Sequence, residues 1–449
     1  MAVCSRPRSV AAWLLAISLA ISGAAGAQTP FASPPEDPVL KALVAEALSH
    51  NPQLRVVQSA IDAARVRIDP ASALPDPMIS ATWTNDGWAP SVGSMPMTTL
   101  GFMVSQELPW SGKRQLRADL AASEARQAEP PLARETLAIE AAVKRAYYGL
   151  LQTRELQSLI VEQRALWSEI EVVVRSRYAV GQGAQQDVLR VQVEVTRIEQ
   201  RAIEQAAEAE LRVAELNRLL ARPIGSPIET SARLVLRPLP GTIEDAVERA
   251  RAISPELESV RRAIQTEQAA LALAKREFKP DFTIQGGYMN RGGLDPMWLA
   301  GVGINLPLNR KVRRAAVAGA EIRSKGGGHA LDDITLQLRY RTQERFTRAR
   351  TAEKIVDLYD QGIVPQDRMT VEAAVSNYQS GKVPFVSVLE AMAALYLDRW
   401  TRVGLVADHG RLQASLDEAS LEATSDMTTA TSPMAAVYGS GQAGGMNGK

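Results

Sequence analysis

The sequence predicts a mainly α-helical protein with four membrane β-strands per protomer, built from two copies of one structural unit. Three observations support this fold class. Landmarks recur in the same order roughly 200 residues apart, and long stretches carry apolar residues at three- and four-residue steps. In addition, two pairs of short segments alternate between apolar and polar side chains. The chain therefore resolves into two long coiled-coil hairpins, each attached to two strands.

Four landmarks define the internal repeat. The first-half members are Asn51-Pro52, Pro75-Asp76, Leu108-Pro109 and the pair Tyr178/Gly181. Their second-half counterparts are Ser254-Pro255, Pro280-Asp281, Leu306-Pro307 and Tyr378/Gly381. We place the first repeat at residues 28–221 and the second at 242–420. The segment 222–241, with prolines at 223, 227, 238 and 240, is the predicted linker.

The N-terminal segment has the features of a secretory signal peptide, predicted at residues 1–27. Arg6 and Arg8 precede an apolar run over 10–21, and Ala25-Gly26-Ala27 offers a cleavage site. A single membrane anchor is the alternative, although the run is short for a spanning helix. The only cysteine, Cys4, lies within this segment, so we expect no disulfide, thiolate metal ligand or cysteine nucleophile in the mature chain. We also expect no cofactor.

Composition argues against several classes of function. Lys plus Arg (51) balance Asp plus Glu (50), which gives no field that would favour a nucleic-acid partner. The three histidines are scattered, and no serine elbow or phosphate-binding loop is present. We therefore expect neither an enzyme nor a metal centre built from histidine.

The helices follow from periodicity and from proline placement. Short helices are predicted at 38–49, 52–69, 242–253 and 255–278, several with proline in the first turn. Long helices are predicted from about 111 to 178 and from about 310 to 378. Pro130-Pro131 and the glycines at 326–328 are expected to kink or interrupt them. The tail at 421–449 has little to bury and is expected to be disordered.

The strands are predicted at about 78–84, 98–108, 281–290 and 297–307. Each has one apolar face, and aromatic residues lie at or near strand ends, as in a membrane girdle. The alternative is a pair of hairpins packed on a soluble core. Four strands are too few to close a membrane barrel, so several copies would have to share one. Three copies would supply twelve strands.

With these elements in place, the sequence resembles the TolC-type outer-membrane efflux family over residues 39–419. The most specific segments are the related turn motifs at 178–189 and 378–389. The resemblance implies a homotrimer with a 12-strand β-barrel in the outer membrane of a Gram-negative-type bacterium, in contact with its lipid. An α-helical periplasmic tunnel would continue the barrel. The implied partners are a periplasmic adaptor protein and an inner-membrane pump of the RND type, for which the channel is a passive exit duct.

The resemblance also assigns roles at the turns. Asp187 and Tyr378 match a pair that hydrogen-bonds between helices and holds the tip shut, and Glu390 matches a ring of carboxylates at the constriction. Ser387 and Val383 replace a second carboxylate and a basic residue, which weakens the expected gate. Helix capping by Asp187 and a solvated surface position for Glu390 are the alternatives. The residues expected to dock the adaptor are Tyr178, Gly181, Val188, Leu189, Gly381, Val388 and Leu389.

The sequence does not identify which cargo the channel would carry. The run at 108–114 looks like the heavy-metal cation branch of the family, and Met78, Met95, Met97 and Met103 lie near the first strand pair. Thioethers bind copper(I), but methionine also fills gaps in packing. Drug efflux and type I protein secretion are alternatives. A periplasmic adaptor is a further one, although it would carry one hairpin and a lipoyl-like domain.

Overall fold

The computed structural model describes residues 37–421, apart from residues 87, 89, 92–96 and 231–232. The predicted signal peptide, Met95 and the tail beyond residue 421 lie outside this part. The described chain is mainly helical with four strands, as the sequence predicts. Among the described residues, no helix combines the length and apolar character needed to cross a bilayer.

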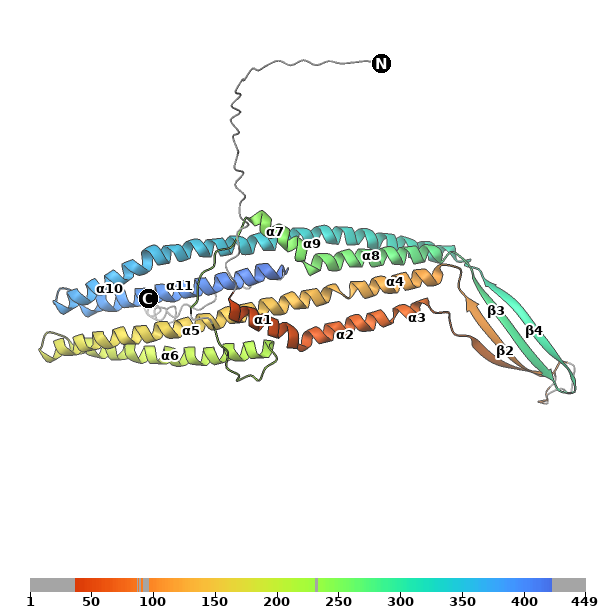
Figure 1. Cartoon of the computed structure of the whole chain (residues 1–449), viewed down its shortest axis with the longest axis horizontal. Helices are drawn as coiled ribbons and strands as arrows, with labels where there is room; N and C mark the ends of the chain where they lie inside the picture. Colours follow the sequence, from red (N-terminus) through yellow and green to blue (C-terminus); the bar gives the residue numbers. More distant parts are fainter. Residues whose placement is uncertain (1–36, 87, 89, 92–96, 231–232, 422–449) are drawn as a thin grey trace, which may run out of the picture. The chain divides into compact units, whose positions relative to one another are not determined.

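The first half contains two strands between shorter and longer helices (Figure 1). Its elements are α1 (Pro38–His50), α2 (Pro52–Val66), α3 (Ile68–Ser72), β1 (Met78–Thr84), β2 (Thr99–Leu108), α4 (Lys113–Gln127), α5 (Pro130–Ala179) and α6 (Gln185–Leu219). The second half repeats this order. It contains α7 (Ile243–Ile253), α8 (Pro255–Arg276), β3 (Asp281–Arg291), β4 (Leu294–Asn305), α9 (Arg310–Leu358), the π-helix η1 (Tyr359–Ile363), α10 (Val364–Gln379) and α11 (Phe385–Glu418).

Local capping fixes where the short helices begin. Asp37 accepts a 3.0 Å hydrogen bond from the N–H of Val39, and Asn51 accepts one of 2.9 Å from Gln53. In each case the proline at the first helical position has no N–H to leave unpaired. The predicted helix at 52–69 is instead divided into α2 and α3, because Pro70 has no N–H to continue the α2 hydrogen-bond ladder.

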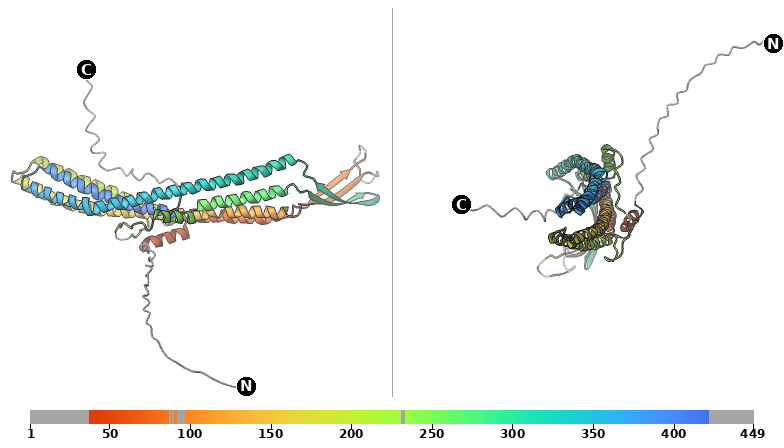
Figure 2. Two further views of the ribbon diagram at one scale, coloured as in Figure 1. Left: turned by 90° about the horizontal axis from the view of Figure 1, so that it is seen from above. Right: turned by 90° about the vertical axis from the view of Figure 1, so that its left-hand side faces the viewer.

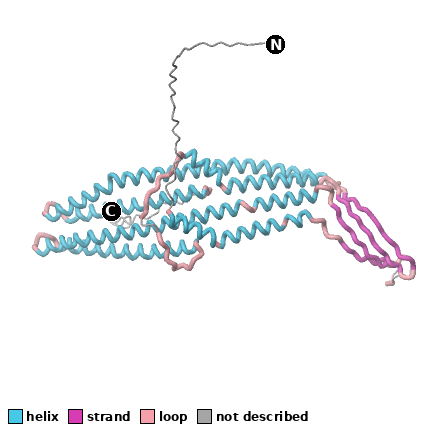
Figure 3. The backbone as a smooth tube through the Cα atoms, in the orientation of Figure 1, coloured by secondary structure: helices cyan, strands magenta, loops and turns pink. Residues whose placement is uncertain are grey.

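Strands and helical turns occupy opposite ends of the long helices (Figure 3). Helix α5 has 50 residues and α9 has 49, so each extends for about 75 Å at 1.5 Å per residue. The hairpins α5–α6 and α10–α11 form two pairs when viewed end-on (Figure 2). Two apolar clusters hold these helices together, one centred on Tyr147 and Leu150 and the other on Trp167 and Tyr378.

The four strands form one antiparallel sheet in the order β1-β2-β3-β4. The central pairing joins the two repeats, with Leu108 of β2 opposite Phe282 of β3. The outer edges of β1 and β4 have no partner strand in the described part of the chain. One face carries exposed apolar side chains, including Phe102 (55% exposed) and Val302 (71% exposed). Such a face is unusual for a sheet in water.

The second long helix differs from the prediction. Gly326–328 do not interrupt it, because α9 continues through all three glycines. A Cβ at Gly327 would lie 2.7 Å from Cγ1 of Ile264, so this glycine permits close packing of α8 on α9. The helix is interrupted at η1, one residue before Pro365, which has no N–H for the α-helical ladder. In the first half, the structure does contain the expected break before Pro130, between α4 and α5.

A buried ion pair joins the sheet to the helices. Lys113, at the start of α4, is 1% exposed and places its Nζ 2.9 Å from Oδ2 of Asp281 at the start of β3. The other carboxylate oxygen of Asp281 accepts a 2.8 Å hydrogen bond from the N–H of Trp110. Gly112 turns the chain into α4 at φ +86°, a conformation that glycine adopts without strain. The run at 108–114 therefore has a structural role.

The segment between the repeats packs against the helices. Its described residues form no helix or strand, and Ile228, Leu234 and Leu239 are buried. The N–H of Leu239 donates a 2.6 Å hydrogen bond to Glu353 of α9. The predicted linker is therefore part of the folded structure.

Candidate functional site

The turns that close the two hairpins share one backbone geometry. In the first turn, residues 180–184, the N–H of Gln182 bonds to the carbonyl of Arg177 and that of Gly181 to Tyr178. In the second turn, residues 380–384, Lys382 bonds to Asn377 and Gly381 to Tyr378 in the same way. This is the Schellman arrangement, which needs a residue of positive φ after the helix. Gly181 and Gly381 provide it, at +76° and +78°.

Tyr378 lies in the last turn of α10, directly before the second turn. Its side chain is 4% exposed and belongs to the apolar cluster between the hairpins. Its ring lies 5.3 Å from the ring of Phe385 across the turn, at an interplanar angle of 58°. The last turn of α10 and the first turn of α11 therefore hold this tyrosine in one position.

The Tyr378 hydroxyl donates a hydrogen bond of 3.2 Å to Oδ2 of Asp187 in the first turn of α6. The structure thus brings together the two residues that the family resemblance paired. Burial raises the pKa of Tyr378 to about 12, and the Asp187 carboxylate adds to the rise. The hydroxyl therefore remains protonated at neutral pH and remains a donor.

Arg177, which the sequence analysis did not single out, completes this contact. Its guanidinium lies 4.7 Å from the centre of the Tyr378 ring, in cation–π geometry. Its Nη2 also donates a 3.0 Å hydrogen bond to the carbonyl of Gln182. Arg177 of α5 therefore supplies a positive charge near the turns. The family resemblance led us to look for a basic residue at position 383, which is occupied by Val383. The only feature of the sequence that could have pointed to Arg177 is its position, immediately before Tyr178 of the turn motif.

The residues expected to dock a partner separate into exposed, half-buried and buried groups. Tyr178 and Leu189 are 48% and 54% exposed, and both turn glycines are exposed. Val188 and Leu389 are half-buried against the apolar cluster. The expectation for Val388 is wrong, because its side chain is 1% exposed and packs in the core of the hairpins. Val180, which was not predicted, is 68% exposed on the first turn.

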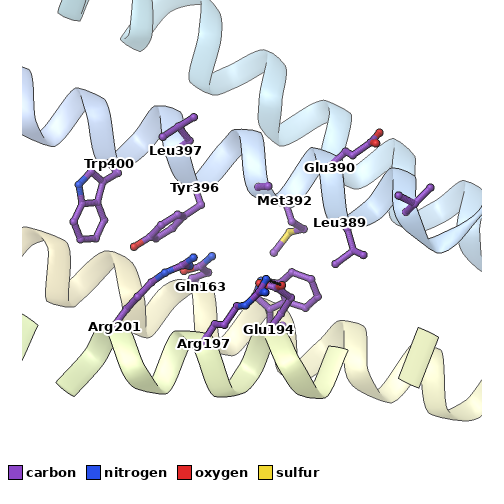
Figure 4. Close-up of a pocket in the computed structure, with 13 residues that line it drawn as sticks. Gln163, Glu194, Arg197, Arg201, Leu389, Glu390, Met392, Tyr396, Leu397 and Trp400 are labelled. Atoms are coloured by element: carbon purple, nitrogen blue, oxygen red, sulfur yellow. Dashed lines mark hydrogen bonds and ion pairs between the residues drawn. The ribbon is translucent and has the colours of Figure 1, made fainter. Parts of the chain in front are cut away.

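Glu390 is exposed on α11, at the edge of a cavity of about 210 Å³ between α5, α6 and α11 (Figure 4). In this view its carboxylate points away from Arg197 and Glu194 of α6. Ser387 lies in the first turn of α11 and donates its N–H to the carbonyl of Pro384. Glu390 is therefore available to face solvent or another copy of the chain.

Aromatic and basic side chains form part of the cavity lining. Trp167, Tyr396 and Trp400 line it together with Arg197 and Arg201. The Arg201 guanidinium lies 4.9 Å from the centre of the Tyr396 ring. In the part of the chain that the structure describes, no group of three or more His, Cys, Asp or Glu side chains is arranged to hold a metal ion.

Comparison with known proteins agrees with this architecture. Residues 43–222 match the sequence model of the outer membrane efflux protein family. Nodulation protein T of Rhizobium leguminosarum bv. trifolii is 23% identical over 409 residues, which are 85% of this chain and 85% of that protein.

Solved structures show the same fold. The outer-membrane channel OprN superposes with a TM-score of 0.72 at 18% identity, over 85% of this chain and 90% of that one. The outer membrane protein VceC of Vibrio cholerae gives 0.69 at 18% identity, over 85% and 96%. Residues 43–222 therefore match the outer membrane efflux protein family in sequence, and the chain has the same fold as the solved structures of OprN and VceC.

Proposed function

We propose that three copies of this chain form the outer-membrane channel of a tripartite efflux system, a passive duct served by a periplasmic adaptor and an inner-membrane pump of the RND type. The observation that carries the proposal is the four-stranded sheet. It combines an exposed apolar face with two unpaired edges, β1 and β4. In lipid, unpaired backbone groups are costly, so these edges require partners.

The internal repeat predicts how the edges meet. Within the chain, β2 of the first repeat pairs with β3 of the second, and Val104 lies opposite Gly286. The matched landmarks make Val302 the equivalent of Val104 and Ala81 the equivalent of Gly286. In the trimer, β4 of one copy therefore pairs with β1 of the next, with Val302 opposite Ala81.

The side-chain alternation supports this register. Ala81 lies opposite Phe102 and Val302 opposite Ile284, so both residues share the apolar face of the sheet. A shift of one residue would put the apolar side chains of one strand beside the polar side chains of its neighbour.

The register can be tested by forming disulfides in the purified, detergent-solubilised protein. The variant Ala81→Cys/Val302→Cys should form disulfide-linked dimers and closed trimers on a non-reducing gel. Cys4 is the only natural cysteine, so its removal with the predicted signal peptide would leave no other thiol to react.

The matched control is Val104→Cys/Gly286→Cys, the equivalent pair inside one chain. It should give a cross-link within the monomer and no linked oligomers. If the first variant gave only monomers under conditions that oxidise the control, the proposed seam between copies would be wrong.

The turns fit the opposite end of the duct. The Tyr378–Asp187 bond joins the two hairpins of one copy, and Glu390 is exposed nearby. Three such carboxylates around one axis would attract cations and repel one another.

Tyr178, Val180 and Leu189 give the region of the first turn an exposed apolar surface suited to an adaptor. We infer that adaptor binding there breaks the Tyr378–Asp187 bond and opens the duct.

A further inference from the structure

Four methionines form a diagonal line across the sheet, one on each strand. Met78 of β1 lies opposite Ser105, two residues from Met103 of β2. Met103 lies opposite Gly287, two residues from Met289 of β3. Met289 lies directly opposite Met297 of β4. Because side chains alternate along a strand, all four project from the same face.

Two glycines make room for the methionine side chains of the central strands. Gly101 lies opposite Met289, and Gly287 lies opposite Met103, so the two methionines occupy one diagonal of a square and the two glycines the other. A Cβ at Gly101 would lie only 3.1 Å from Cγ of Met289. The Met289 side chain therefore leans over β2, the strand that carries Met103.

The spacing suits shared binding of one ion. Directly opposed residues such as Met289 and Met297 have Cβ atoms about 5 Å apart, and diagonal neighbours about 7–8 Å. A methionine side chain is long and has three rotatable bonds, so the thioethers of Met103 and Met297 can approach that of Met289 from the strands on its two sides.

Gap filling does not explain the position of these methionines or the exposure of the two outer ones. They lie on the polar face of the sheet, beside Ser80, Thr82 and Gln285, and not on the apolar face. Met78 is 64% exposed and Met297 48% exposed, so neither fills a core within the chain. In a barrel whose apolar face meets lipid, the polar face lines the duct.

We propose that Met103, Met289 and Met297 form a binding site for soft monovalent metal cations, copper(I) or silver(I), inside the duct. Thioether sulfur is a soft ligand that favours such ions over magnesium or calcium. Such a site identifies soft monovalent metal cations as a class of cargo for the channel. Its position inside the duct rests on the proposed function. All three ligands come from one chain, however, so ion binding itself does not depend on the trimer.

The test uses the purified channel in detergent, titrated with copper(I) in competition with a chromogenic copper(I) chelator, and separately with silver(I). The wild type should bind one ion per chain. The variant Met103→Leu/Met289→Leu/Met297→Leu keeps side chains of similar size and should bind at least about tenfold more weakly. X-ray absorption of the copper complex should show sulfur ligands in the wild type only.

Met369→Leu is the matched control, because Met369 is 60% exposed but lies on α10, away from the sheet. It should bind as the wild type does, and magnesium should bind to none of the variants at this site. Equal copper(I) affinity in the wild type and the triple variant would overturn the metal site. Trimer formation and conductance, measured on the same samples, would report separately on the channel.

Discussion

The hydroxyl of Tyr378 lies 3.2 Å from Oδ2 of Asp187, and this single hydrogen bond joins the end of α10 to the start of α6. The two residues are 191 positions apart in the sequence: Tyr378 precedes the second turn, whereas Asp187 follows the first. The equivalent of Tyr378 in the first repeat, Tyr178, is half exposed. The turns share their backbone but differ in the contacts of their tyrosines.

Removal of this bond should open the duct. A phenol–carboxylate hydrogen bond contributes about 1–3 kcal/mol, so Tyr378→Phe/Asp187→Asn should shift the population of the turns toward an open state. We expect higher single-channel conductance in planar bilayers while trimers still form. Tyr178→Phe, at the exposed counterpart, should leave conductance unchanged. Equal conductance in the double variant and the wild type would exclude a gating role.

The ion pair at the start of α4 should dominate stability at the sheet. Lys113→Met leaves the Asp281 carboxylate without its buried partner, which costs about 3–5 kcal/mol for pairs of this kind. We expect a clearly lower thermal midpoint by circular dichroism. Lys311→Met, at an exposed position in the first turn of α9, should change stability by less than about 0.5 kcal/mol. Similar midpoints for the two variants would contradict this role.

Neighbouring glycines in α9 should respond in opposite directions to alanine. At Gly327 a Cβ would lie 2.7 Å from Ile264, so Gly327→Ala should lower the thermal midpoint through overpacking of about 1–3 kcal/mol. At Gly328 no atom lies within 4 Å of that position, and Gly328→Ala should stabilise the helix by about 1 kcal/mol. The same sign of change in both variants would refute close packing at Gly327.

Asp367 should make stability fall as pH rises. Burial, together with the neighbouring Asp398, raises the pKa of Asp367 to about 6. The folded state therefore holds this proton more tightly than the unfolded state, and stability is lost between about pH 4 and pH 6. Asp367→Asn should raise the thermal midpoint at pH 7.5 by an amount worth about 1 kcal/mol, allowing for solvent screening, and should have little effect at pH 4.

Asp360→Asn provides a control of opposite sign, since Asp360 pairs with Arg402 and its loss should lower the midpoint at pH 7.5. An Asp367→Asn variant less stable than the wild type at pH 7.5 would show that the charged carboxylate is favourable in the folded state.

The sequence predicted the elements well where one local rule governed them. Strand β1 has the predicted bounds, and β2 and β3 differ by one residue at one end. Strand β4 begins at Leu294, earlier than expected, because pairing with Arg291 extends it through Pro296. The glycines at 326–328 misled the prediction, since helix propensity disfavours glycine but packing against Ile264 requires it.

The candidate site was only partly accessible from sequence. The turn motifs located Tyr378 and Asp187, because glycine at a helix end has a local conformational cause. Arg177 could not be found in the same way, since its contact with the Tyr378 ring depends on how α5 packs beside α10. Val388 was assigned to the surface, but helix rotation places it in the core.

The sequence alone determined the duplication, the alternation of the strands and the positions of the turns, since each depends on residues close together in the chain. The tertiary structure decided which distant residues meet. Met103 and Met289 became neighbours only through the pairing of β2 with β3, and Tyr378 reached Asp187 only through the packing of the two hairpins. Strand register and helix rotation are set by burial over the whole molecule, which no local pattern of residues specifies.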